Sequence, residues 1–377
     1  MLENSLTPYF LLSSLLLLDM YAFEFHDKPL VLTWILFTVA PGLDHIVPLN
    51  QHNPTKEEQK ILKKEMKWRV PPILFCLIDW FYFFWGFNKL ASGTLSTGHT
   101  IAMIFSIGNG GGLSFTTSHE IFHKKDLFSR IFGTLNLTKT FYMQFFIQHN
   151  TVHHKYVATP LDPATAKFGQ TFPQFLVQSV KGTFFQSWEY EVKRLGTAWT
   201  VKNRHFWFLG AELALTMLIY WLYSWYGVAV LFIQAVISIQ LLEAVNYVEH
   251  YGLERKEISP GVYEPVTIKH SWNAAHTVSN YLFLKLQRHS DHHENAYKPY
   301  QTLCSYKVSP NLPCGYGICI LASNFPSLWF AMINPLAMQA NLNGNVKKED
   351  LEKSEYVLKA VAMLQSVVLT ALFIIFV

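Results

Sequence analysis

The sequence has few charged residues for its length. Of its 377 residues, 15% are Asp, Glu, Lys or Arg, whereas a soluble globular chain carries about 25%. Half of the residues are hydrophobic, and the mean hydropathy is positive at +0.16. This composition argues against a soluble protein, because a water-exposed surface needs more charge. The net charge of +4 is also small and gives no reason to expect a nucleic-acid partner.

Cysteine is scarce as well, and its spacing excludes two kinds of module. The four cysteines are Cys76, Cys304, Cys314 and Cys319, and no two of them form a C-x-x-C pair. Fused rubredoxin-type and zinc-ribbon modules need such pairs, so neither is expected here. Internal repeats, low-complexity stretches and the basic start of a signal peptide are missing too. The first apolar run is therefore predicted to stay in the chain as a membrane span.

Long apolar runs account for the missing charge. Six runs are each close to the roughly 17 to 25 residues that cross a bilayer as a helix. They are Leu6–Phe23, Leu30–Val47, Val70–Phe87, His99–Thr117, Trp207–Tyr226 and Val228–Tyr247. A seventh run, Ala360–Val377, ends the chain. We predict an all-α membrane protein: a six-helix transmembrane bundle in residues 1–340, then a polar connector (Asn341–Glu355) and an additional C-terminal transmembrane helix in residues 341–377.

Basic residues cluster in alternate connections between these runs. Lys56–Arg69 contains six Lys or Arg residues, and Lys124–Arg204 contains more, whereas the loops at His26–Lys28 and Leu90–Gly98 are nearly neutral. The positive-inside rule then places the two basic segments in the cytosol. Because membrane topology already requires these charges, we predict a multi-pass protein of the lipid bilayer and no nucleic-acid partner.

Histidines are concentrated in four motifs. In Leu286–His293, three histidines fall at i, i+3 and i+4, which predicts that they share one face of a helix. The nine histidines of the four motifs are His119, His123, His149, His153, His154, His250, His289, His292 and His293. All lie at predicted cytosolic ends of spans or in the cytosolic segments between them. Independent structural histidines would not sort in this way, so we predict that they bind metal.

Nine imidazoles exceed what one metal ion needs. One ion takes about four to six ligands, so we predict two ions that keep open coordination positions. A closed structural zinc site would need about four ligands and would favour cysteine. Open, nitrogen-rich sites beside an apolar cavity suit iron and oxygen chemistry.

Other polar residues near the motifs are candidates for outer contacts. A carboxylate there fixes the tautomer of an imidazole through its second ring nitrogen. The candidates are Glu120, Glu243, Glu249, Asp291, His270 and His276. Glu243 is the best-supported of the carboxylate candidates because it lies inside a predicted span, where an ionised side chain is costly unless it has a binding partner. For Glu120 and Asp291, a solvated or charge-balancing role is an equal alternative.

The fourth run contains four glycines in the five positions from Gly108 to Gly112. Small residues allow helices to pack closely, and this interpretation stands beside a functional one. In the functional interpretation the glycines leave room for a lipophilic substrate in a channel formed by the second to fourth spans. The candidate channel residues are Phe105, Gly108, Gly111, Gly112, Leu113 and Phe115.

The four motifs together resemble the histidine boxes of the membrane-bound alkane monooxygenases, which belong to the integral-membrane di-iron hydroxylases and desaturases. The matching stretches are His119-Glu120-Ile121-Phe122-His123, His149–His154, Asn246–Leu253 and Leu286–His293, with His270–Asn273 in addition. The resemblance implies two iron ions held by the nine histidines, without heme or bound nucleotide. It also implies O2-dependent hydroxylation of the terminal carbon of an alkane, with electrons from rubredoxin and its reductase.

Two departures from the family pattern stand out. Gln148 and Val152 replace the Glu and Gly usual in the second box, so a charge near the metals is lost while all three histidines remain. The C-terminal helix is additional to the usual six. Alternatives are a fatty-acyl desaturase, a xylene-type aryl-methyl hydroxylase, a metal transporter and a non-catalytic member of the family. A transporter would need a polar path across the membrane, and the predicted spans carry few polar residues.

Overall fold

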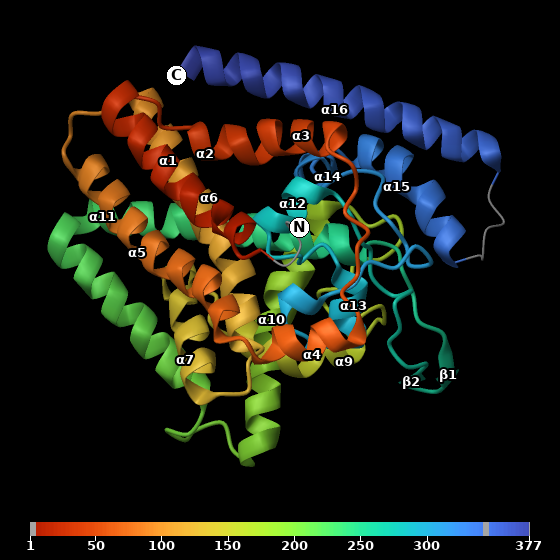
Figure 1. Cartoon of the computed structure of the whole chain (residues 1–377). Coiled ribbons are helices and arrows are strands. Elements are labelled where there is room, and N and C mark those ends of the chain that lie inside the picture. Colours follow the sequence, from red (N-terminus) through yellow and green to blue (C-terminus); the bar gives the residue numbers. More distant parts are fainter. Residues whose placement is uncertain (1–4, 342–346, 377) are drawn as a thin grey trace.

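The computed structural model describes residues 5–341 and 347–376. Over those residues it is mostly helical, with a single small antiparallel sheet of β1 (Glu257–Ser259) and β2 (Val262–Tyr263). Figure 1 shows the helices gathered into one bundle, with the hairpin β1–β2 projecting at its edge. The all-α prediction is confirmed at this level.

The N-terminal part is a hairpin that packs against a long helix. The 3-10 turn η1 (Thr7–Phe10) leads into α1 (Leu11–His26), and α2 (Val31–Trp34), the π turn η2 (Ile35–Val39) and α3 (Ala40–Ile46) return. The Asp19 carboxylate is fully buried between them and accepts hydrogen bonds from the Leu32 amide at 2.7 Å and the Tyr82 hydroxyl at 2.6 Å. These bonds satisfy a polar group that would otherwise be costly inside an apolar bundle. Next come α4 (Lys56–Lys64), η3 (Met66–Arg69) and α5 (Val70–Ala91), which carries Tyr82.

The glycine run lets α6 (Thr97–Phe122) lie directly against α11 (Arg204–His250). A Cβ on Gly108 would be 2.7 Å from Ile237 Cβ, closer than real contacts allow. The Ser238 hydroxyl donates a 2.8 Å hydrogen bond to the Gly108 carbonyl across the same contact. Close packing through small residues, one of the two interpretations of this run, is therefore what Gly108 does.

Helix α11 contains both of the runs that predict spans five and six. Ser224 has non-helical angles, φ 58° and ψ −162°, and separates the helix into two halves that run in different directions in Figure 1. Three described helical stretches are long and apolar enough to cross a membrane: Thr7–His26, Met66–Ala91 and Arg204–His250. These stretches support membrane association, and the count of six spans stays a prediction.

A short segment, which we call the inserted segment, packs against both α6 and α11; it is partly exposed at its start and buried further along. It comprises α7 (Leu127–Asn136), η4 (Leu137–Thr140) and α8 (Phe145–Gln148). The Lys139 ammonium is buried against Asp79 of α5 at 2.5 Å, and the Lys139 carbonyl accepts a 2.5 Å hydrogen bond from the Gln234 amide of α11. These contacts hold the segment at the depth of the glycine run. The segment leads directly into the second histidine motif.

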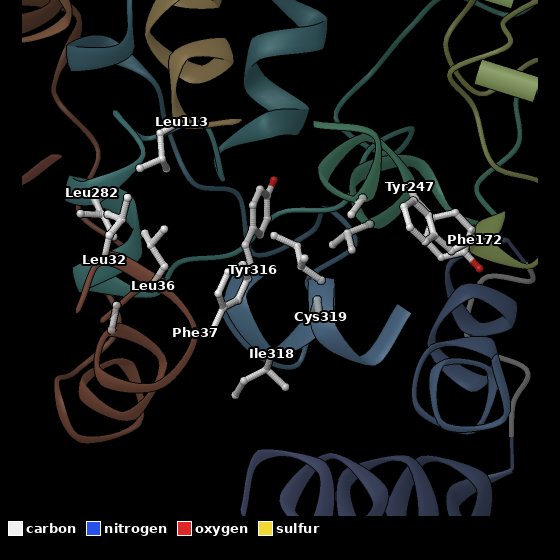
Figure 2. Close-up of a cluster of buried hydrophobic side chains, with 14 of the residues drawn as sticks. Leu32, Leu36, Phe37, Leu113, Phe172, Tyr247, Leu282, Tyr316, Ile318 and Cys319 are labelled. Atoms are coloured by element: carbon white, nitrogen blue, oxygen red, sulfur yellow. The ribbon is translucent and has the colours of Figure 1, made fainter. Parts of the chain in front are cut away.

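The chain continues into the histidine-bearing and C-terminal elements. They are η5 (His149–His153), α9 (His154–Tyr156), α10 (Phe172–Leu195), α12 (Thr277–Leu282), α13 (His289–Glu294), η6 (Tyr300–Thr302), α14 (Tyr316–Ser323), α15 (Pro326–Asn341) and α16 (Lys348–Phe376). In Figure 2, Phe37 lies beside Tyr316 of α14, Leu32 and Leu36 lie near Leu282 of α12, and Ile318 points to the other side of α14.

The predicted polar connector Asn341–Glu355 needs a correction. Residues 342–346 lie outside the described part, but α16 already begins at Lys348, so the second half of the connector is helical. Ion pairs between residues four apart favour this helix: Lys348 with Glu352 at 3.5 Å and Lys359 with Glu355 at 2.8 Å. In Figure 1, α16 lies across one side of the bundle next to α15.

Candidate metal centre

The four histidine motifs come together at one end of α6 and α11. Their nine side chains form two groups, and within each group the ligand atoms lie within 4.8 Å of one another. The first group has five members, His119, His123, His149, His154 and His292. The second group has four, His153, His250, His289 and His293. The structure thus brings all nine predicted residues to one place and divides them five to four.

The five-histidine group has the spacing of ligands around one ion. The Nε2 atom of His119 lies 2.8 Å from that of His149, 3.0 Å from that of His292 and 3.1 Å from that of His123. A neutral imidazole has one N–H and cannot satisfy three such neighbours by hydrogen bonding. Two nitrogens at right angles around an ion, each about 2.1 Å away, would be about 3.0 Å apart. The convergent lone pairs therefore fit a bound cation.

The four-histidine group has the same character. The Nε2 atom of His289 lies 3.1 Å from that of His250 and 3.0 Å from that of His293. The Nε2 atom of His153 is buried and has no hydrogen-bond partner among the described residues. A buried, unpaired nitrogen aimed at other imidazoles is costly unless something binds it. This set of nitrogen donors suits iron, zinc, copper or nickel.

Two short helices contribute to both groups, which fixes the distance between the groups. Helix α13 sends His292 to the five-histidine group and His289 and His293 to the other. All three side chains face the centre, with ring centroids 4.5 to 5.6 Å apart; the i, i+4 pair enters one group and the i+3 residue enters the other. The π turn η5 acts similarly, since its wider i to i+5 winding groups His149 with His154 and leaves His153 for the second group.

Burial favours the neutral form of five of these imidazoles. Withdrawal from solvent lowers the pKa of these five well below the ordinary 6.5, and mutual repulsion lowers it further. This holds for His149, His154, His289, His292 and His293. A neutral imidazole has a lone pair for a metal, so the environment prepares the groups for binding.

Sequence reasoning missed two outer contacts. The His153 Nδ1 atom lies 2.8 Å from a carboxylate oxygen of Asp162, in the loop before α10, and the His250 Nδ1 atom lies 3.4 Å from the Ser271 hydroxyl. Such partners fix the tautomer and orientation of a ligand. The signal for Asp162 is weak in the sequence, because a single Asp in a Pro-rich loop is more often a turn residue.

Asp162 also changes how the replacement of the usual Glu by Gln148 is interpreted. The Gln148 side-chain amide donates a 3.3 Å hydrogen bond to Asp162, so the charge expected to be lost with the missing Glu is present on a neighbouring carboxylate. Val152, the second departure, is half-buried on the π turn and belongs to neither histidine group.

Among the predicted carboxylates, Glu249 lies nearest the histidines. One oxygen is 3.3 Å from His289 Nε2, and the other accepts a 2.7 Å hydrogen bond from the Tyr316 hydroxyl of α14. Glu243 instead accepts hydrogen bonds from the Tyr142 hydroxyl at 2.8 Å and the Asn246 amide at 3.2 Å. Its described hydrogen bonds thus join α11 to the inserted segment and do not reach an imidazole.

The remaining candidates make contacts of other kinds. Asp291 pairs with the Lys298 ammonium at 2.6 Å and accepts the Cys304 amide at the same distance, which is the charge-balancing alternative. His270 accepts the Thr267 amide at 3.0 Å. His276 is buried outside both groups, and its Nδ1 atom has no partner among the described residues.

Glu120 bears on a possible zinc-protease interpretation, because His119-Glu120-Ile121-Phe122-His123 also has H-E-x-x-H spacing. In that motif the glutamate is the general base. Here its carboxylate pairs with the Lys124 ammonium and accepts the Tyr300 amide at 3.2 Å. With its oxygens engaged in these contacts, and three further histidines in the group, the arrangement does not support a protease.

Two adjoining apolar cavities lead from the histidines into the bundle, and we describe them as the inner and outer parts of one cavity. Its inner part touches both groups through His119, His149 and His289, and also touches Glu249. Its outer part lies between α6, α11, α14 and η2. The two parts share the lining residues Gly112, Thr116, Val245 and Leu286.

Three of the predicted channel residues line this cavity and three do not. Gly112, Leu113 and Phe115 are in its wall. Gly108 and Gly111 are turned to the α11 contact, and Phe105 is half-exposed on the outside of α6. The division follows position along α6: residues 112, 113 and 115 lie nearer the histidine end of the helix, whereas residues 105, 108 and 111 lie further from it.

Comparison with known proteins gives matches over most of the chain. A family model described as "Fatty acid desaturase" matches residues 94–313. The chain is 32% identical to alkane 1-monooxygenase of Pseudomonas putida over 336 residues, which cover 86% of this chain and 82% of that protein. It is also 32% identical to alkane 1-monooxygenase of Acinetobacter baylyi, covering 85% and 78%. The hydroxylase component of xylene/toluene monooxygenase from P. putida is more distant, at 29% identity over 57% of this chain.

Proposed function

This chain belongs to the alkane 1-monooxygenase family, and on that premise we propose that it hydroxylates the terminal methyl group of an alkane-like substrate with O2 at a centre of two iron ions. The observation that carries the proposal is the division of nine convergent imidazoles into groups of five and four. Each group has enough nitrogen donors to hold one ion, with His119, His149 and His289 facing the apolar cavity.

Iron bound in these groups would supply the activation of O2 and the transfer of one oxygen atom to carbon, with the other leaving as water after two electrons and two protons are added. The protein positions the substrate and excludes water. Phe115, Leu242 and Val245 give the inner cavity an apolar wall that holds a methyl group beside the histidines. Glu249, fixed by Tyr316, is the carboxylate placed to hold or release a proton beside His289.

We assign electron delivery to a rubredoxin-type protein with its reductase, acting from the cytosol. The positive-inside rule supports this side, because Lys124–Arg204 carries the second histidine motif. His154 is half-buried, whereas the other eight histidines of the two groups are buried. A donor that docks over His154 would bring its electron closest to a metal without opening the cavity.

The test is expression of the full chain with rubredoxin and rubredoxin reductase, followed by incubation with n-alkanes of several lengths. We expect 1-alkanols and about two iron ions per chain. His119→Ala should abolish the product and lower the iron content, while His99→Ala is the matched control, since His99 lies on the same helix but outside both groups.

Parallel incubations with xylene and with an acyl lipid separate this activity from the two related ones. Benzyl alcohols in place of 1-alkanols would identify an aryl-methyl hydroxylase, and an unsaturated lipid would identify a desaturase. Wild-type activity in His119→Ala would contradict the assignment of the metal ligands.

A further inference from the structure

The cavity is too narrow for an alkane as it stands. Its inner and outer parts each have a volume of about 30 Å³, whereas an engineered apolar cavity that binds benzene has about 150 Å³. A chain of several methylene groups can enter only if a wall moves. Which wall yields, and how far, therefore decides which substrates are accepted.

The outer wall is built from two elements that meet edge to edge. We define the outer wall as the four lining residues Leu36 and Phe37 of η2 and Gly317 and Ile320 of α14. A Cβ on Gly317 would be 2.9 Å from the Leu36 carbonyl oxygen. The two elements are thus in direct contact, and a long substrate would have to separate them.

Helix α16 lies behind the outer wall and joins its two elements through one side chain. The Gln365 side-chain amide donates to the Phe37 carbonyl at 2.5 Å and is 3.5 Å from the Gly317 carbonyl. Gln365 is buried, at 8% exposure, in a mainly apolar stretch of the helix. Burying an amide there costs free energy unless the amide makes hydrogen bonds.

The Phe37 carbonyl lacks its α-helical donor. Four residues further along the chain is Pro41, which has no N–H to complete a helical hydrogen bond. The Gln365 amide donates to this carbonyl from another part of the chain. A second contact, the stacked rings of Trp34 and Phe373 at 4.6 Å, holds α16 against α2 nearby.

We propose that Gln365 is a positioning residue that clamps η2 to α14 and thereby sets the length of alkane that the cavity accepts. This inference rests on the proposed function, because it concerns the same cavity. Weakening the clamp lets the outer wall separate more easily. Long alkanes need more separation of the wall than short ones, so their kcat/KM should rise more.

The experiment compares Gln365→Met with Ser354→Ala in the full chain. Met keeps the length of the side chain and removes the donor. Ser354 is the matched control: its hydroxyl ties α16 to the Met332 carbonyl of α15 at 2.5 Å, away from the outer wall. Two quantities are measured, the ratio of kcat/KM for a long and a short n-alkane, and amide hydrogen exchange in residues 31–46 and 315–323.

We expect Gln365→Met to raise the long-to-short ratio about fivefold, the effect of losing one buried hydrogen bond of about 1 kcal/mol. Exchange in both segments should rise, the iron content should stay at the wild-type value, and Ser354→Ala should change neither readout. If Gln365→Met does not accumulate, Gln365→Asn, whose amide is one methylene short of the outer wall, serves in its place.

An unchanged ratio with unchanged exchange would overturn the proposal, as would an equal shift in Ser354→Ala, because both results would deny a specific clamp. Failure of the wild-type chain to oxidise any alkane would instead count against the proposed function. The exchange comparison would still decide whether Gln365 holds the two elements together.

Discussion

Asp162→Ala tests the four-histidine group through a residue that touches no substrate. The Asp162 carboxylate is buried and holds His153 Nδ1 at 2.8 Å. It is fixed in turn by the Thr165 hydroxyl at 2.7 Å and the Ala164 amide at 3.1 Å. Removing it frees the His153 ring to rotate, while the other three imidazoles of the group keep their positions.

The size of the effect follows from the role of an outer contact. Loss of such a contact costs about 10-fold to 100-fold in metal affinity, or about 1.4 to 2.7 kcal/mol. His153 belongs to the four-histidine group and not to the five-histidine group. We therefore expect the variant to lose one of two iron ions selectively, falling toward one per chain, with turnover reduced at least tenfold.

The assay is iron content by mass spectrometry during titration with a chelator, together with the rate of 1-alkanol formation. Asp162→Asn keeps one oxygen acceptor and should fall between wild type and Asp162→Ala. Asp126→Ala is the control, since Asp126 caps α7 through the Ser129 amide at 2.9 Å and has no described contact with an imidazole. Two tightly held iron ions and wild-type turnover in Asp162→Ala would refute the reasoning.

Three further predictions follow from other contacts. Tyr316→Phe removes the 2.7 Å hydrogen bond to Glu249 and should slow turnover about tenfold with both irons retained; an unchanged rate would show that Glu249 needs no anchor. Val245→Phe narrows the section shared by both parts of the cavity, so alkane oxidation should fall while iron content, measured on the same sample, does not; full activity would place the substrate elsewhere. Glu191 concerns stability: burial raises its pKa, but hydrogen bonds from Arg194 and Arg204 outweigh this and lower the pKa from 4.5 to about 2. Because the folded pKa is below the unfolded one, Glu191 stabilises the fold above about pH 4.5 and this contribution is lost as the pH falls toward 2. Glu191→Gln should flatten the pH dependence of thermal unfolding in detergent over that interval, and an unaltered dependence would contradict the ion-pair account.

For the inserted segment, the local sequence pattern was insufficient to predict which residues are buried. Nothing in residues 127–148 indicates that Lys139 is buried, because a lone lysine in an amphipathic stretch normally faces water. Its position depends on Asp79, about 60 residues earlier, and on Gln234, about 95 residues later. Contacts between such distant residues leave no periodic signal.

The amino-acid sequence by itself determined the chemistry of the site and the kind of protein that carries it. Histidine is recognisable wherever it stands, and nine of them in four motifs point to metal without any knowledge of the fold. Apolar runs likewise reveal membrane association, since bilayer thickness dictates helix length. The family resemblance rests on the same motifs, and the comparisons confirm it.

Only the tertiary structure decided how these residues are shared out and supported. The division into five and four depends on a π turn and on the direction in which α13 enters the bundle. Asp162 and Tyr316 are partners of His153 and Glu249 only because the loop before α10 and helix α14 fold against the histidine motifs. The Gln365 contact joins residues more than 300 positions apart. Each of these depends on three-dimensional proximity, which hydrophobic periodicity and motif spacing do not encode.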